Sequence, residues 1–132
     1  MNRFENEVLR PAVLEWLATV PEIVVHVAPV EILSRAGRRR SSAELGAGTP
    51  DLLCSMRWHA RGVYGAQWLA FELKSQAGVL SKVQRDEHAA WERAGRWVYV
   101  VHTVQQVQDS VQRVRMRLRE AGLVPVPVIG CG

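Results

Sequence analysis

Three short segments between residues 48 and 84 decide the fold of this chain: Gly48-Thr49-Pro50-Asp51-Leu52, Phe71-Glu72-Leu73-Lys74-Ser75 and Gly78-Val79-Leu80-Ser81-Lys82-Val83-Gln84. Their patterns predict an apolar strand over residues 52–56, a second strand over 67–74 and a helix over 82–94 that Ser81 caps. Side chains two apart on a strand share a face. Glu72 and Lys74 are therefore expected to project together, while Leu73 turns into the core.

The two predicted strands bring a pair of carboxylates together. Residues 57–65 are interpreted as a hairpin connection, so the strands are expected to be antiparallel neighbours. Asp51 opens one strand and Glu72 ends the other, which places both at the same edge of the sheet. Paired carboxylates need a proton or a cation between them. Mg²⁺ prefers oxygen ligands, and the Lys74 ammonium can hold or help deprotonate one of its waters, so the pattern favours a metal site.

Length and composition set the outer limits. The 132 residues predict a single domain over 1–132. Apolar runs long enough for a membrane span, and a signal-peptide pattern, are not found in the sequence, so we expect a cytoplasmic protein with no membrane partner. The spacing of the two cysteines matches neither a disulfide framework nor a zinc site. A net charge of +4 is compatible with a polyanionic partner.

A helix is expected over residues 4–18. Its apolar stripe lies close to the direction of Glu5, whereas Glu7 faces solvent, so Glu5 is the acid aimed at the interior. An equally plausible reading makes Glu5 a first-turn acid that the helix dipole favours. Pro11 bears on the choice, because a helix that begins near this proline would break the geometry linking Glu5 to the stripe.

A basic segment over residues 34–48 follows a predicted strand at 23–28. It carries four arginines, Arg35, Arg38, Arg39 and Arg40, and almost nothing to bury. The plain interpretation is a solvated charge run. Because the segment leads directly to Asp51, we favour phosphate contact by these guanidinium groups.

The element order indicates the fold class. A strand at 97–101, a helix at 103–120 and an extended tail complete the order helix, strand, strand, strand, helix, strand, helix. This order predicts an α/β fold with a mixed central sheet flanked by helices. The 82–94 helix is a crossover, which makes the following strand parallel to its neighbour in the sheet.

The quoted segments resemble the PD-(D/E)XK nuclease superfamily, and more narrowly its VRR-NUC branch of small stand-alone phage and bacterial proteins. The resemblance implies a restriction-endonuclease-like core of αβββαβ order with an added C-terminal helix. It also implies that Asp51, Glu72 and the Leu73 carbonyl bind Mg²⁺ or Mn²⁺. Lys74 would then orient the attacking water, and Gln84 would support the site.

The same resemblance implies an activity. The helix glutamate of the family corresponds best to Glu5, with Glu7 as the competing choice, and Glu5 becomes a further metal ligand. The expected function is metal-dependent, structure-specific cleavage of DNA, as a Holliday-junction-resolving homodimer on branched DNA. The alternatives are a flap, nick or restriction-type nuclease, and a non-catalytic nucleic-acid-binding module that keeps the fold.

Overall fold

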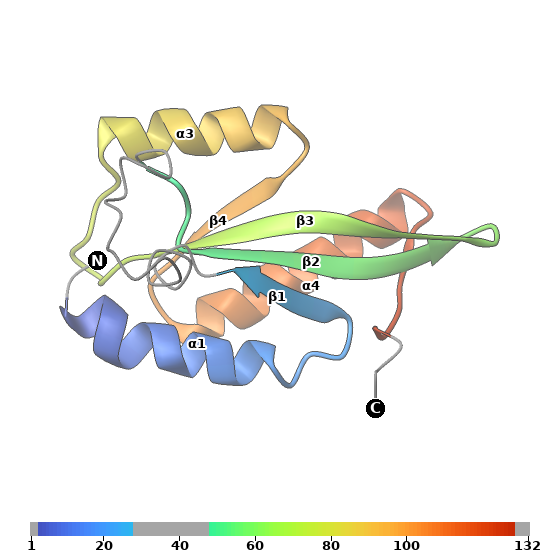
Figure 1. The fold of residues 1–132 in the computed structure, drawn as a ribbon, viewed down its shortest axis with the longest axis horizontal. Helices are drawn as coiled ribbons and strands as arrows, with labels where there is room; N and C mark the ends of the chain where they lie inside the picture. Colours follow the sequence, from blue (N-terminus) through green and yellow to red (C-terminus); the bar gives the residue numbers. More distant parts are fainter. Residues whose placement is uncertain (1–2, 28–47, 129–132) are drawn as a thin grey trace, which may run out of the picture.

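The computed structural model describes residues 3–27 and 48–128 (Figure 1). The strands are β1 (Ile23–Val27), β2 (Leu52–Ala60), β3 (Val63–Leu73), β4 (Trp97–Val101) and β5 (Val124–Pro125). The helices are a π-helical turn (Glu5–Leu9) that continues into α1 (Arg10–Leu17), then α3 (Lys82–Arg93) and α4 (Val104–Glu120). Within these two ranges, none of the helices has both the length and the apolar character that a membrane crossing requires.

The strands form one mixed sheet in the order β1-β2-β3-β4, with β5 paired to β2. The β1/β2 and β2/β3 pairs are antiparallel, and β4 runs parallel to β3. The parallel pair is possible because α3 carries the chain back across the sheet between these strands. These observations confirm the α/β class, the mixed sheet with flanking helices, and the crossover.

The hairpin between β2 and β3 is tighter than the sequence analysis predicted. Residues 57–65 are not a loop, because β2 continues to Ala60 and β3 begins at Val63. Arg61 and Gly62 alone make the turn, with φ angles of 49° and 81°. Two consecutive left-handed residues match the twist of the flanking strands, and glycine adopts this conformation without steric cost. Both strands are therefore long, and the hairpin turn lies at the end of the strand pair opposite to Asp51.

The first helix begins irregularly. The Arg10 N–H bonds to the Glu5 carbonyl, five residues back, which widens the turn before Pro11. Proline lacks the N–H of a regular turn, so a widened turn accommodates it near the start of α1. Glu5 is buried and Glu7 is exposed, as predicted. A regular helical period predicts Val8 on the apolar stripe of this helix, but Val8 is exposed, because the π-helical turn changes the period there.

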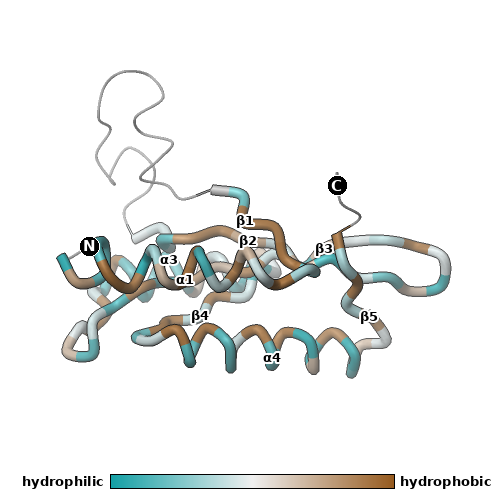
Figure 2. Tube along the Cα trace, turned by 90° about the horizontal axis from the view of Figure 1, so that it is seen from below, coloured by the Kyte–Doolittle hydropathy of each residue, from teal (hydrophilic) through white to brown (hydrophobic). Residues whose placement is uncertain are grey.

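One face of the sheet holds the hydrophobic core. Alternating residues of β2 and β3 pack there against α1 and α4, among them Leu52, Met56, Leu69 and Phe71. Figure 2 shows the matching pattern on α4, whose apolar turns face the sheet and whose polar turns face away. The tail also packs on the body, since the Val126 N–H donates to the Arg57 carbonyl. Because side chains alternate along a strand, Asp51 and Glu72, next to the core residues Leu52 and Phe71, point to the opposite face of the sheet.

Candidate active site

Asp51 and Glu72 face each other across β2 and β3. Leu52 pairs with Phe71 in the ladder, so the next position brings Asp51 opposite Glu72. The Leu73 N–H donates to Asp51 Oδ2 at 2.8 Å, which fixes the Asp51 carboxyl at the end of the strand. The two carboxyl groups also share a hydrogen bond. The convergence predicted from the antiparallel pairing is therefore present.

The environment of this pair favours protonation. Burial, and then the hydrogen bond and charge of Glu72, raise the pKa of Asp51 from 3.8 to about 8. Burial also raises the pKa of Glu72, and the negative charge of Glu5 acts in the same direction. Only 3% of Glu72 is exposed. The pair consequently retains a proton near neutral pH. A cation bound between the two carboxyl groups could take the place of this proton and balance their negative charge.

Lys74 lies at the end of β3, on the same side as Glu72. Its positive charge opposes the rise in the Glu72 pKa, so the ammonium acts on that carboxylate. The side chain runs along Gly78, where an added Cβ would come within 3.2 Å of Lys74 Cβ and 3.3 Å of Lys74 Cδ. Gly78 leaves room for the lysine stem in the turn that follows the strand. This placement agrees with the prediction that the side chains of Glu72 and Lys74 point to the same side of the strand.

Glu5 joins the site from the first helix. It is 4% exposed, and its Oε1 accepts the Ser75 N–H at 2.7 Å, directly after Lys74. The prediction that Glu5 faces inward is confirmed, whereas Glu7 lies on the surface and pairs with Arg3 at 2.9 Å. The structure thus favours Glu5 over Glu7 as the helix acid. A ligand role for Glu5 stays a prediction.

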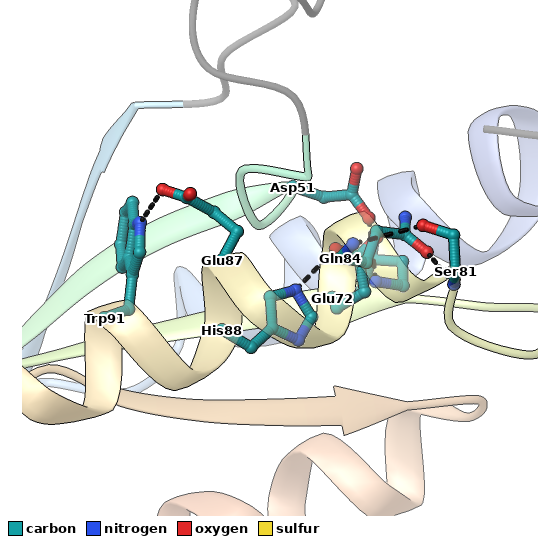
Figure 3. Close-up of polar contacts among 8 residues, drawn as sticks. Asp51, Glu72, Ser81, Gln84, Glu87, His88 and Trp91 are labelled. Atoms are coloured by element: carbon teal, nitrogen blue, oxygen red, sulfur yellow. Dashed lines mark hydrogen bonds and ion pairs between the residues drawn. The ribbon is translucent and has the colours of Figure 1, made fainter.

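Gln84 has a defined structural partner in the first turn of α3. The Ser81 N–H donates to Gln84 Oε1 at 3.0 Å, and Ser81 Oγ accepts the Gln84 N–H at 3.1 Å, which makes a capping box (Figure 3). The amide oxygen expected to support the carboxylates is therefore engaged in holding the helix start. Gly48 packs against this turn, since a Cβ there would lie 2.7 Å from the Val83 carbonyl oxygen.

His88 is a site residue that the sequence analysis missed. Its Nε2 lies 3.1 Å from Glu72 Oε1, and the residue is 7% exposed (Figure 3). Burial lowers the pKa of His88 despite the neighbouring carboxylates, which favours the neutral ring. The helical spacing could have identified His88, because it lies four residues after Gln84 and therefore on the same face of α3, which turns toward the site.

The carboxyl oxygens of Asp51 and Glu72 are the kind of ligand that a hard divalent cation binds, although the described side chains do not surround a complete metal site. Among residues 3–27 and 48–128, no three His, Cys, Asp or Glu side chains form a group that could hold a metal ion. The donors that come together are the oxygens of Asp51 and Glu72, and few protein oxygens are typical of Mg²⁺, which keeps several waters. The raised pKa of Asp51 shows that the two carboxyl groups need a positive partner, and a bound divalent cation would provide it.

The predicted phosphate contacts were placed on Arg35, Arg38, Arg39 and Arg40. All four lie outside the described residues, so their role stays a prediction. The segment that contains them ends at Gly48, where the chain turns into the site with a φ of 83°. A side chain at Gly48 would be strained in this conformation as well as crowded by α3.

Comparison with known proteins does not assign this chain to a family. No family model matches the chain, and no match was found among curated proteins or solved structures. The molecule is thus defined by its own geometry: an α/β domain with a mixed sheet and a carboxyl pair made of buried Glu72 and half-buried Asp51. An ammonium group, a third acid and a buried histidine adjoin this pair.

Proposed function

We propose that this protein is a divalent-metal-dependent, structure-specific DNA endonuclease with a restriction-endonuclease-like core. The observation that carries the proposal is the carboxyl pair of half-buried Asp51 and buried Glu72, which lie opposite each other at the end of β2 and β3. Burying two like charges together costs free energy unless a cation or a catalytic proton shares the site. Strongly shifted acid pairs of this kind are concentrated at functional sites.

The side chains present suit the hydrolysis of a phosphodiester bond. Asp51, Glu72 and the Leu73 carbonyl would hold Mg²⁺ or Mn²⁺, which would supply electrostatic stabilisation of the charge that develops on the phosphate. Lys74 would orient the attacking water by donating a hydrogen bond to it. His88 holds one oxygen of Glu72, and the Leu73 N–H holds one oxygen of Asp51. The acid pair is therefore anchored from both sides of the site.

The substrate we favour is branched DNA, cut by a homodimer in the manner of a Holliday-junction resolvase. A domain of 132 residues with one acid pair can cut two strands symmetrically only when two copies act together. This part of the proposal rests on the resemblance of the segments around Asp51, Glu72 and Gln84 to the VRR-NUC branch. Flap, nick and restriction-type cleavage are the alternatives at the level of substrate.

A labelled four-way junction tests the proposal beside matched duplex, flap and single-stranded DNA. Each is incubated with Mg²⁺, Mn²⁺ or EDTA and with wild type, Lys74→Ala or Lys82→Ala. Lys82 is a matched control, because it is an exposed lysine that pairs with Asp86 on α3. We expect metal-dependent, symmetric cuts in the junction that Lys74→Ala abolishes and Lys82→Ala retains. Cutting that survives Lys74→Ala would remove this lysine from the proposed chemistry.

A non-catalytic nucleic-acid-binding module is the second candidate. One observation favours it: the described residues bring no group of three His, Cys, Asp or Glu side chains together that could hold a metal ion, so the acid pair would supply the only side-chain ligands from this part of the chain. On this hypothesis Glu72 forms a structural contact with His88. Tight binding of branched DNA with no cleavage in either metal would support the binding module over the nuclease.

A further inference from the structure

Four side chains extend the acid-bearing face of the sheet away from the site: His26 on β1, Arg57 on β2, and Tyr64 and Trp68 on β3. We call them the strip. Ser55 pairs with Trp68 and His59 with Tyr64, and side chains alternate along β3. Trp68 and Tyr64 therefore lie on the face that carries Glu72. The proposed hydrolysis at the acid pair uses none of the four.

Trp68 presents an aromatic surface that its neighbours hold in place. The ring centroids of Trp68 and His26 are 4.5 Å apart at an interplanar angle of 42°. His26 Nε2 is in turn 2.6 Å from Ser55 Oγ, and Ser55 is buried in the sheet. Trp68 nevertheless remains 39% exposed. An anchored indole with an open part is suited to stacking against a planar ligand.

Arg57 supplies a positive charge beside the aromatic side chains of the strip. Its guanidinium carbon lies 4.5 Å over the ring of Tyr64, which is 55% exposed. The Arg57 Nε is buried, and among residues 3–27 and 48–128 no hydrogen-bond acceptor reaches it. Because Nε is buried, an incoming oxygen ligand would be attracted by the charge of the guanidinium group rather than bound at Nε. Phosphate oxygens are the preferred partners of such a fork-shaped cation.

A hollow of about 330 Å³ lies beside Arg57 and Tyr64. Val24 of β1 and Val128 of the C-terminal tail line it together with these two residues. The volume is at the lower end of the range for small-molecule sites. The apolar walls and the arginine together resemble the surroundings that a base and its phosphate require.

We propose that the strip binds a single-stranded DNA segment that leads to the acid pair. The inference rests on the proposed function and narrows its substrate to branched DNA with unpaired nucleotides. Aromatic stacking needs a free base face, which a closed duplex does not offer, while Arg57 provides the charge complementary to the backbone. Asp51, just before β2, and Arg57, within β2, are six positions apart on one face of the sheet. This separation is roughly 20 Å at ~3.4 Å per residue, so a single DNA strand can reach both residues.

Binding by the whole protein in EDTA tests this proposal without cleavage. Fluorescence anisotropy is measured with a labelled oligothymidine, a splayed-arm DNA and a blunt duplex, at several salt concentrations. The variants are Trp68→Ala, Trp68→Phe and Arg57→Gln. Arg117→Gln is the matched control, because Arg117 also stacks on an aromatic ring, Trp97, at 3.7 Å, but lies on α4 behind the sheet.

We expect Trp68→Ala to weaken binding of the two DNAs with unpaired bases roughly ten-fold and duplex binding less than about two-fold. Trp68→Phe should retain most of the affinity, because phenylalanine still stacks. Arg57→Gln should reduce the salt dependence by about 0.7 in the log–log slope, the value for one contact on a single strand. Arg117→Gln should bind all three DNAs as the wild type does.

The outcomes separate this proposal from the proposed function. Wild-type cleavage of DNA in Mg²⁺, together with unchanged binding by Trp68→Ala and Arg57→Gln, would overturn the strip and leave the nuclease intact. Equal losses on duplex and single strand in Trp68→Ala would also overturn it, because stacking on unpaired bases could not be the cause. Wild type that neither binds nor cuts any DNA would overturn both.

Discussion

His88 Nε2 lies 3.1 Å from Glu72 Oε1, and both side chains are almost completely buried. His88→Ala leaves that carboxylate oxygen without its partner inside the protein. We expect the free energy of unfolding to fall by about 1–3 kcal/mol and DNA cleavage to fall about 10- to 100-fold. Urea denaturation and single-turnover cleavage measure the two effects.

His88→Gln is the matched variant, because glutamine keeps a donor at this position. It should recover part of both quantities. A cleavage rate in His88→Ala equal to that of the wild type would show that the contact with Glu72 does not orient the carboxylate for the reaction.

The contact between Gly48 and α3 predicts a second effect. In Gly48→Ala, the new Cβ would lie 2.7 Å from the Val83 carbonyl oxygen and 2.9 Å from Gln84 Cα, at a residue with a φ of 83°. The first turn of α3 must move away from the chain that leads to Asp51. We expect the variant to lose about 2–4 kcal/mol of stability and most of its cleavage. Thermal denaturation and the junction assay test this.

Gly122 offers a matched control for backbone strain alone. Its φ is 81°, close to that of Gly48, but an added Cβ would meet no atom within 4 Å. Gly122→Ala should therefore cost about 1 kcal/mol, with cleavage unchanged. If both variants lost the same stability, crowding against α3 would not be the cause in Gly48→Ala.

The raised pKa of Asp51 predicts how stability depends on pH without metal. The folded protein binds a proton at Asp51 up to about pH 8, whereas the unfolded carboxyl has lost it above pH 3.8. The folded state thus holds more protons, so its stability falls as pH rises toward 8, by up to about 1.4 kcal/mol per pH unit. Between pH 7 and 8.5 in EDTA, we expect the melting temperature to fall by a few degrees.

This window avoids the opposing titration of His88. Its lowered pKa adds stability as pH rises, but that gain is complete above the ordinary value of 6.5. Mg²⁺ should raise the melting temperature more at pH 8.5 than at pH 7, because it competes with the proton for the acid pair. A metal-free melting temperature that rises across the window would contradict the assigned pKa shift.

Much of this architecture could be predicted from local pattern. Antiparallel pairing of two short apolar strands was enough to place Asp51 opposite Glu72. Ser81 as the cap predicts the start of α3 at Lys82, as observed, and the helix ends at Arg93, one residue before the predicted end. Helical spacing in the first helix also identified Glu5 as the buried acid.

The misses have physical causes that a periodic pattern does not contain. The sequence predicts too long a hairpin connection, because Arg61-Gly62 makes a turn of only two residues while the strands beside it carry polar and aromatic side chains. A regular helical period predicts Val8 in the core, and the prediction fails because the widened turn before Pro11 shifts the helical phase. His88 was missed because its importance arises only when α3 packs over Glu72.

Asp51→Asn separates the chemical role of the acid pair from its effect on stability. Asparagine can still accept the Leu73 N–H, but it removes a carboxylate from a site where two carboxyls compete for one proton. We expect cleavage to fall by at least about 10²-fold, since a cation ligand and its charge are lost. Stability in EDTA at pH 8.5 should stay equal or rise, and its dependence on pH should flatten. Cleavage assays and thermal melts at pH 7 and 8.5 measure these effects.

Glu22→Gln provides the opposite control. Glu22 is a partly buried carboxylate that Arg115 holds at 2.7 Å, and this hydrogen bond lowers the pKa of Glu22. Its contribution to stability is complete above pH 4.5 and is lost in the variant, so the melting temperature should drop at both pH values while cleavage persists. Asp51→Asn should show the reverse on both measurements. If Asp51→Asn cut DNA as well as Glu22→Gln does, the acid pair would not be the catalytic site.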